Sequence, residues 1–125
     1  MAQSSNDQRI DYVEFTVGEI ARARDFYGNA FGWTFKDYGP GYCEFRDGRL
    51  TGGFALAGPD TASTAPGSRG GGPLVILYAD DLDATQKRVE QAGGRIVKPA
   101  YQFPGGRRFH FADPEGYELA VWSAT

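Results

Sequence analysis

The two halves of this chain repeat one pattern of residue types at an offset of 62 positions. The match runs without a gap from Val13 and Val75 to Gly32 and Gly94, through strand-like alternation, helical spacing and a helix stop. Any two strand–helix units share part of such a pattern, but here the apolar stripe and the helix stop keep the same register. The repeat therefore predicts a β-α-β-β-β unit that occurs twice.

Periodicity and turn residues predict the elements of each module. In the first, we expect strands at 10–17, 33–37, 42–46 and 50–57, and a helix from Ile20 that stops at Gly32. In the second, we expect strands at 74–79, 95–97, 107–111 and 118–122, a helix at 82–92 and a turn at 113–116.

A length of 125 residues suits one domain with one core. We expect a disordered tail at 1–8 and a single domain at 9–125. Within that domain, module one covers 9–58, a Pro/Gly/Ser-rich linker covers 59–73 and module two covers 74–125.

Charge and residue counts exclude several classes of function. The formal net charge of −3 lacks the basic footprint of a nucleic-acid binder. A single cysteine, Cys43, excludes an internal disulfide, and we expect it to be a buried structural thiol. A single histidine, His110, excludes any site that needs two from one chain. With no membrane-length apolar run and no signal-peptide pattern, we expect no membrane association and a cytoplasmic location.

Short motifs link the chain to a known group of proteins. The first half carries VEF at 13–15, DFY at 25–27 and FGW at 31–33, and the second carries DDL at 80–82, AGG at 92–94 and DPEG at 113–116. These motifs resemble the vicinal-oxygen-chelate superfamily, which contains glyoxalase I, bleomycin-resistance proteins and extradiol dioxygenases. The resemblance covers residues 9–123, and small stand-alone members related to lactoylglutathione lyase look most similar.

The resemblance implies an α+β fold in which two βαβββ modules form a curled, partly open barrel-like sheet. The helices would lie outside and a concave cavity inside. It also implies a homodimer, with sites at or near the subunit interface. Whether the modules pair within one chain or across a dimer stays open at this stage.

The resemblance further implies four metal-ligand positions, on the first and last strand of each module. Three of them fall on Tyr12, Leu74 and Ala120, and the remaining strand, within 50–58, contains no Asp, Glu or His. Because such sites need imidazole or carboxylate donors, we predict that the metal site is lost and that no cofactor is bound. A register slip of two residues would instead bring in Glu14 and Glu118, which would make only a weak site for a hard cation.

Strand alternation predicts what lines the cavity instead. The predicted ligand-binding residues are Tyr12, Glu14, Leu74, Ile76, Tyr78, Glu118, Ala120 and Trp122. We also expect contributions from Phe54, Phe103 and Phe109. An aromatic wall with one or two carboxylates suits a flat organic molecule, including a cationic one, although such side chains can also simply fill a small barrel. Glu14 is the one weak candidate for a catalytic group, as a general base that could pair with Glu118.

Two other polar features have plainer interpretations. We expect His110 to be a hydrogen-bonded or solvated histidine rather than a ligand. We expect the segment 105–108, with two glycines and two arginines, to be an exposed hairpin tip rather than an anion clamp.

These observations favour a metal-free protein that binds a small hydrophobic or aromatic compound, in the manner of antibiotic-sequestering relatives. The alternative is a metal-dependent lyase or isomerase that resembles lactoylglutathione lyase. A third hypothesis is a dimeric interaction domain without a small ligand. Binding is favoured over catalysis, because the donor atoms for the metal are missing.

Overall fold

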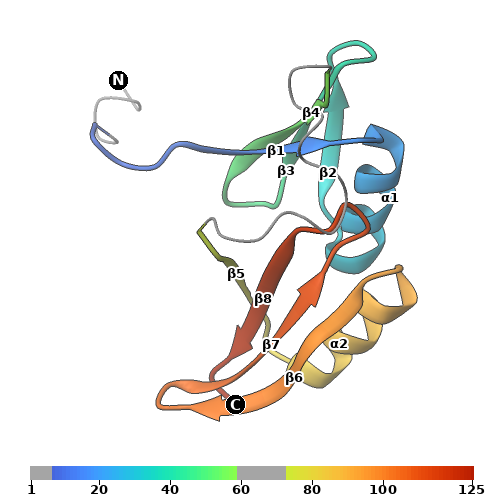
Figure 1. Ribbon diagram of the computed structural model, residues 1–125. Coiled ribbons are helices and arrows are strands. Elements are labelled where there is room, and N and C mark those ends of the chain that lie inside the picture. Colours follow the sequence, from blue (N-terminus) through green and yellow to red (C-terminus); the bar gives the residue numbers. More distant parts are fainter. Residues whose placement is uncertain (1–6, 59–72) are drawn as a thin grey trace.

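The computed structural model describes residues 7–58 and 73–125, and its element order confirms two β-α-β-β-β modules (Figure 1). The first module consists of β1 (Tyr12–Val17), α1 (Ile20–Phe31), β2 (Thr34–Asp37), β3 (Tyr42–Arg46) and β4 (Thr51–Leu56). The second consists of β5 (Val75–Tyr78), α2 (Leu82–Gln91), β6 (Arg95–Phe103), β7 (Gly106–Ala112) and β8 (Glu118–Ser123). Most of the predicted tail and linker lies outside the described residues.

Each module forms its own four-stranded sheet, and the two sheets have the same topology. The strand orders are β1-β4-β3-β2 and β5-β8-β7-β6, with the first and last strand of each module running parallel. The sheets are curled but not closed, and both helices lie on one side of them (Figure 1). The α+β fold expected from the sequence is therefore confirmed, and β1 and β5 are edge strands.

The helices end where the glycines predict, with one difference between the modules. Gly32 follows α1 with φ of 74°, a left-handed conformation that glycine adopts without steric penalty. After α2 the left-handed residue is Gly93, with φ of 107°, so the repeat slips by one residue there. Gly94, which the offset pairs with Gly32, packs closely instead, because a Cβ would lie 2.7 Å from Cγ1 of Val89. Neither of these helices, nor any other described one, is long and apolar enough to cross a membrane.

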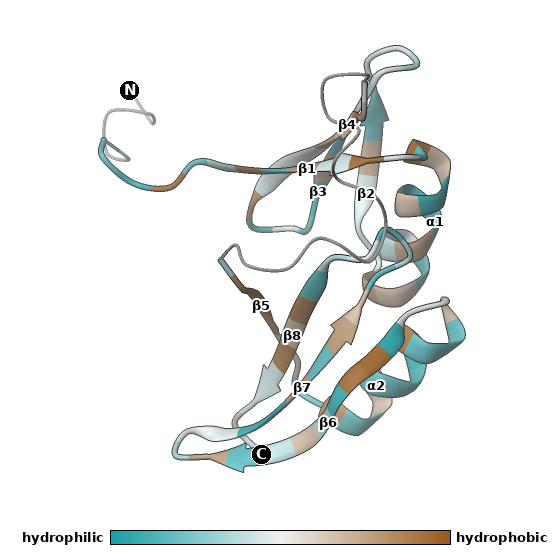
Figure 2. Cartoon of the chain, in the orientation of Figure 1, coloured by the Kyte–Doolittle hydropathy of each residue, from teal (hydrophilic) through white to brown (hydrophobic). Residues whose placement is uncertain are grey.

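Aromatic side chains fill the core between the sheets and the helices. Tyr27 of α1 stacks on Trp33 at 4.5 Å between ring centroids, and Trp33 stacks on Phe45 at 4.6 Å. Phe54 and Phe109 are also buried in this core, so their predicted contribution to the cavity is wrong. Both point to the helix side of their sheets. Hydropathy colouring shows hydrophobic residues along β8 and a mostly hydrophilic α2 (Figure 2).

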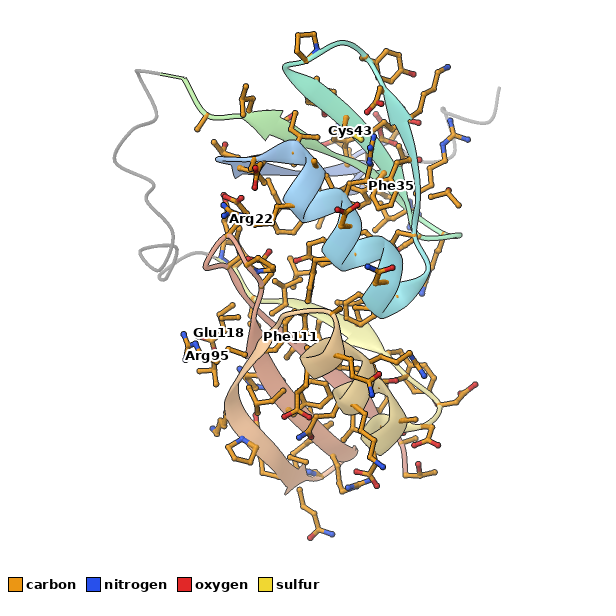
Figure 3. All side chains as sticks on the ribbon, turned by 90° about the vertical axis from the view of Figure 1, so that its right-hand side faces the viewer. Arg22, Phe35, Cys43, Arg95, Phe111 and Glu118 are labelled. Carbon is orange, nitrogen blue, oxygen red and sulfur yellow. The ribbon has the colours of Figure 1, made fainter. Side chains whose placement is uncertain are left out.

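The turn before β8 joins the second module to the first. Glu115 is fully buried and accepts hydrogen bonds from the backbone of Gly18, at 2.6 Å, and from Arg22 of α1. Arg22 is labelled on α1 in Figure 3. Asp113 accepts a hydrogen bond of 2.7 Å from the Tyr27 hydroxyl. Burial raises the pKa of Asp113, although these hydrogen bonds oppose the shift. Burial also raises the pKa of Tyr27. The DPEG motif therefore fixes the position of one module against the other.

Strand β6 is longer than predicted, since the sequence indicated a strand only at 95–97. Pro99 breaks the periodicity there, because proline cannot donate to a strand ladder. The structure accommodates it on an edge strand, with register shifts on both sides of Lys98. The extra length places Tyr101 and Phe103 on the sheet.

Candidate functional site

The predicted ligand-binding residues lie on the helix-free faces of the two sheets, in two groups. Tyr12 and Glu14 belong to the first sheet. The other six, on β5 and β8 or just before β5, belong to the second sheet: Leu74, Ile76, Tyr78, Glu118, Ala120 and Trp122. Of these six, Ala120 has no exposed surface. Their alternation follows the prediction, because intervening residues such as Leu77 and Val121 pack against the core.

Two tyrosines hold the carboxylate of the first-sheet group. The Tyr42 hydroxyl donates to Oε1 of Glu14 at 2.9 Å and lies 2.5 Å from the Tyr12 hydroxyl. Burial, followed by hydrogen bonding with Tyr12 and Glu14, raises the pKa of Tyr42. Gly53 makes the arrangement possible, because a Cβ there would overlap the Tyr42 ring and hydroxyl. Glu14 thus has a partner within its own sheet.

The positions that correspond to metal ligands do not fit a metal ion. The offset of 62 makes Glu14 the counterpart of Ile76. Ile76 pairs with Ala120 and Glu14 pairs with Gly53, so Gly53 is the counterpart of Ala120 and occupies the fourth ligand position. Of the four positions, only Tyr12 has a donor atom in its side chain, and that hydroxyl is hydrogen-bonded. Within 7–58 and 73–125, no three His, Cys, Asp or Glu residues gather as a metal site requires.

Three aromatic side chains gather on the open face of the second sheet. Tyr78 and Trp122 are register partners, with ring centroids 5.1 Å apart in an edge-on arrangement. Phe103 lies on the other side of Trp122 at 6.1 Å. Next to this aromatic patch (Tyr78, Phe103 and Trp122), Ile76 is 43% exposed, and Tyr78 itself is 54% exposed. The Asp80 carboxylate beside Tyr78 raises the pKa of the Tyr78 hydroxyl.

A chain of hydrogen bonds borders the aromatic patch. The Arg108 guanidinium donates through Nε to the Tyr101 hydroxyl at 2.5 Å. That hydroxyl lies 3.2 Å from Nε2 of His110, and Nδ1 of His110 lies 2.8 Å from Oε2 of Glu118. We call these four residues the polar chain.

Sequence reasoning found only Glu118 of the polar chain as a site residue. The prediction that His110 is hydrogen-bonded is confirmed. The sequence predicts an exposed hairpin tip at 105–108, but Gly106–Ala112 form β7, so Arg108 lies on a strand and only the residues before β7 make the turn. Alternation along β7 could have placed Arg108 and His110 on the face of Glu118, since Phe109 and Phe111 are in the core. Tyr101 had no such signal, because its strand was not predicted.

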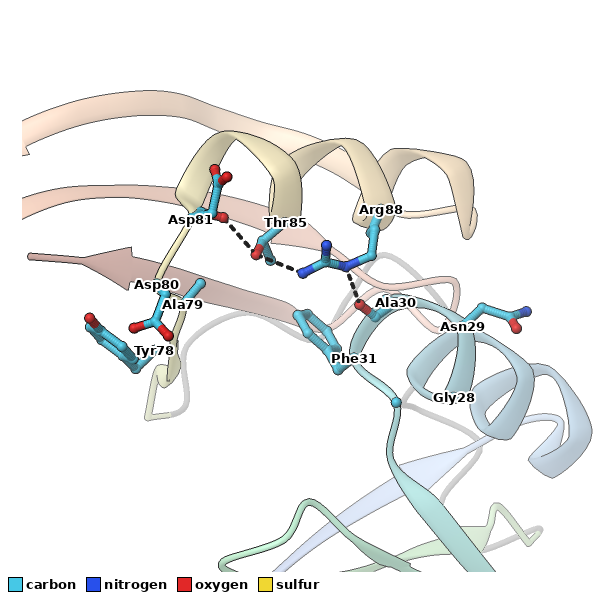
Figure 4. A pocket seen from close by; sticks show the side chains of 11 residues that line it. Gly28, Asn29, Ala30, Phe31, Tyr78, Ala79, Asp80, Asp81, Thr85 and Arg88 are labelled. Carbon is cyan, nitrogen blue, oxygen red and sulfur yellow. Dashed lines mark hydrogen bonds between the residues drawn. The ribbon is translucent and has the colours of Figure 1, made fainter. Parts of the chain in front are cut away.

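A separate pocket of about 610 Å³ lies between the helices (Figure 4). Arg88, which lines the pocket together with Asp80 and Asp81, donates to the Ala30 carbonyl at 3.4 Å and to the Thr85 hydroxyl at 3.1 Å. The bond to Ala30 fastens α2 to α1, so the groove has a structural explanation. Of the predicted site residues, only Tyr78 reaches it.

Comparisons with known proteins agree with this architecture. A family model for the Glyoxalase/Bleomycin resistance protein/Dioxygenase superfamily matches residues 9–121. Anthracycline biosynthesis protein DnrV of Streptomyces peucetius is 39% identical over an alignment of 117 residues, and this alignment covers 83% of this chain and 42% of DnrV. The chain therefore spans less than half of the length of that relative.

Solved structures share the fold over nearly the whole chain. A glyoxalase/bleomycin resistance protein/dioxygenase family enzyme from Burkholderia phytofirmans has a TM-score of 0.79 at 20% identity, covering 93% of this chain and 100% of that one. TioX from Micromonospora has a TM-score of 0.69 at 26% identity, covering 92% and 98%. The chain belongs to the Glyoxalase/Bleomycin resistance protein/Dioxygenase superfamily.

Proposed function

We propose that this protein binds a small hydrophobic or aromatic compound, including a cationic one, on the open face of its second sheet. The binding needs no resident metal, and the protein acts as a homodimer. The observation that carries the proposal is the aromatic patch, where the rings of Tyr78 and Phe103 each make a T-shaped contact with Trp122 on a sheet face that no described helix covers. A buried, reduced thiol at Cys43 fits a cytoplasmic location.

The chemistry of the patch suits a flat ring system. Aromatic contacts contribute about 0.5–1.5 kcal/mol each beyond the buried area. Glu118, whose side chain is 45% exposed, lies on the same face and can pair with a cation. The relative DnrV is named for anthracycline biosynthesis, and anthracyclines combine fused aromatic rings with an amino sugar. An anthracycline is therefore the first ligand to test.

The alternative, a metal-dependent lyase or isomerase, has weaker support because three of the four ligand positions carry no donor side chain. The two hypotheses differ in their response to metal. A metal-free binder keeps its melting temperature when a chelator or a divalent cation is added, whereas a metalloenzyme shifts by several degrees. The third hypothesis, an interaction domain, predicts a dimer that binds no small compound.

Binding can be followed by the fluorescence of doxorubicin, an anthracycline, during titration with the protein. We expect saturable binding by the native chain and at least a tenfold weaker affinity for Trp122→Ala, because the central ring of the patch is removed. Tyr38→Ala is the matched control, since Tyr38 is an exposed aromatic residue outside this face. Equal affinity for native protein and Trp122→Ala would remove the patch from the site.

A further inference from the structure

We propose that the polar chain is a proton relay, and that it catalyses proton transfer at a carbon atom next to the carbonyl of a bound aromatic ketone. Tyr101 is the catalytic residue, and His110, Glu118 and Arg108 set its protonation and charge. The inference rests on the proposed function in one respect, since the ketone must dock on the aromatic patch. It goes beyond that function because it assigns a reaction that needs no metal.

For a neutral His110, the hydrogen-bond partners set the direction of each hydrogen bond in the chain. A carboxylate only accepts, so Nδ1 of His110 carries the hydrogen that is donated to Glu118. Nε2 of a neutral His110 is then an acceptor, and the Tyr101 hydroxyl donates to it. Arg108 has only donors, so it donates to the Tyr101 oxygen. The Tyr101 proton is thus aimed at a base.

Transfer of that proton to His110 would place alternating charges along the chain. If it moves to His110, the four groups in order are a guanidinium, a phenolate, an imidazolium and a carboxylate, so that opposite charges alternate. Lys98 adds a further cation on this face, with Nζ 4.3 Å from the centroid of the Tyr101 ring. An activated hydroxyl, a base and a group that orients the base form the same constellation that activates nucleophiles in many enzymes.

The polar chain and the aromatic patch lie side by side on the face. Strand register makes Arg108 the direct neighbour of Trp122, and the Arg108 guanidinium is 5.9 Å from the centroid of the Phe103 ring. In the described part of the chain, no hydrogen bond joins the terminal nitrogens of Arg108 to oxygens of Asp or Glu. A ring system stacked on Trp122 can therefore place a carbonyl oxygen against this guanidinium.

The reaction balances without an oxidant or another reactant. The Tyr101 oxygen removes the proton from the substrate carbon as its own proton moves to Nε2 of His110. The C–H electron pair becomes a C=C bond, and the carbonyl π electrons move to oxygen, giving an enolate beside Arg108. Return of a proton from Tyr101 to carbon, and of the His110 proton to Tyr101, restores every group. Because the hydroxyl exchanges with water on the open face, the visible product in D2O is a deuterated ketone.

The first test measures the tautomer of His110 in the protein without ligand. His110 is the only histidine of the chain, so a two-dimensional 15N–1H spectrum shows one imidazole. We expect the Nδ1–H tautomer, and we expect Glu118→Ala to increase the Nε2–H tautomer because the acceptor is lost. Glu90→Ala, an exposed carboxylate on α2, is the control that leaves the spectrum unchanged. An Nε2–H tautomer in the native protein would overturn the relay.

The second test measures catalysis with 2-tetralone, a bicyclic aromatic ketone, by the loss of its C1 proton signal in D2O. We expect the native protein to accelerate exchange, and Tyr101→Phe to lower that acceleration about 100-fold, the low end for general acid–base catalysis. Tyr38→Phe, which removes an exposed hydroxyl elsewhere, keeps the native rate. Circular dichroism and doxorubicin binding show whether Tyr101→Phe keeps the fold and the binding site.

Each result of the second test decides one of the two proposals. Doxorubicin binding without accelerated exchange overturns the relay and leaves the proposed function standing. Equal exchange rates for native protein and Tyr101→Phe also overturn the relay. Absence of both binding and exchange overturns the proposed function itself.

Discussion

Among single residues, Glu115 combines a carboxylate with complete burial. It has no exposed surface, yet it lies opposite Arg22, whose side chain is 40% exposed. The hydrogen bond to Glu115 raises the pKa of the Arg22 guanidinium, whereas burial of Arg22 acts in the opposite direction. Backbone amides of Gly18 and Glu19 also donate to this carboxylate. This residue joins the two modules through charge rather than through apolar area.

Replacing Glu115 with Gln tests how much this contact stabilises the fold. The amide keeps the shape but removes the charge, and it turns one acceptor into a donor that faces other donors. We expect the free energy of unfolding to fall by about 3 kcal/mol, the low end for a broken buried pair because Arg22 keeps some water. Urea denaturation followed by fluorescence measures the change.

An exposed ion pair gives the matched control for Glu115. Asp37 contacts Arg24 through both carboxylate oxygens at 3.0 Å, with side chains 59% and 39% exposed. Asp37→Asn is expected to change the free energy of unfolding by less than about 1 kcal/mol, as is usual at surfaces. Similar losses for both variants would show that burial of Glu115 has no special effect.

At the scale of the element, the two helices begin differently. Asp81 caps α2, because its Oδ1 accepts the backbone N–H of Ala84 at 3.0 Å. Glu19 occupies the same position before α1, and its side chain makes no such bond. We expect Asp81→Ala to lower the free energy of unfolding by about 1 kcal/mol and Glu19→Ala to leave it nearly unchanged. Thermal denaturation of the two variants checks this, and equal effects would contradict the capping role.

The elements show what the sequence can and cannot predict. Alternation and helical spacing predict most strands and both helices, because apolar faces must pack against a core. The second half of β6 is not predicted from the sequence, because Pro99 argues against a strand there. An edge strand tolerates a proline that an interior strand would exclude. The polar chain was missed for that reason: Tyr101 reaches His110 only through the pairing of β6 with β7. Contacts between side chains on different strands depend on tertiary structure and cannot be predicted from local sequence patterns.

At the scale of the whole molecule, the uncovered faces and edges are the dominant feature. Helices and the core cover one face of each sheet, and β1 and β5 are edge strands among the strands of the described residues. The edge strand β5 carries exposed apolar residues, including Ile76 at 43% and Tyr78 at 54%. Exposed apolar edges favour association with another chain. In the proposed homodimer, a second copy of this chain contacts this edge.

Native mass spectrometry of the purified protein tests this assembly directly. We expect twice the chain mass of 13.6 kDa, and any bound metal or organic compound would add its own mass. Ile76→Glu is expected to shift the protein to the single-chain mass, because a charge on β5 is desolvated in the interface. Val97→Glu is the control, since Val97 is similarly exposed, at 40%, but lies on β6 at the other edge of the sheet. A dimer that survives Ile76→Glu but not Val97→Glu would move the interface from β5 to β6. A single-chain mass for the native protein would mean that each open face binds its ligand alone.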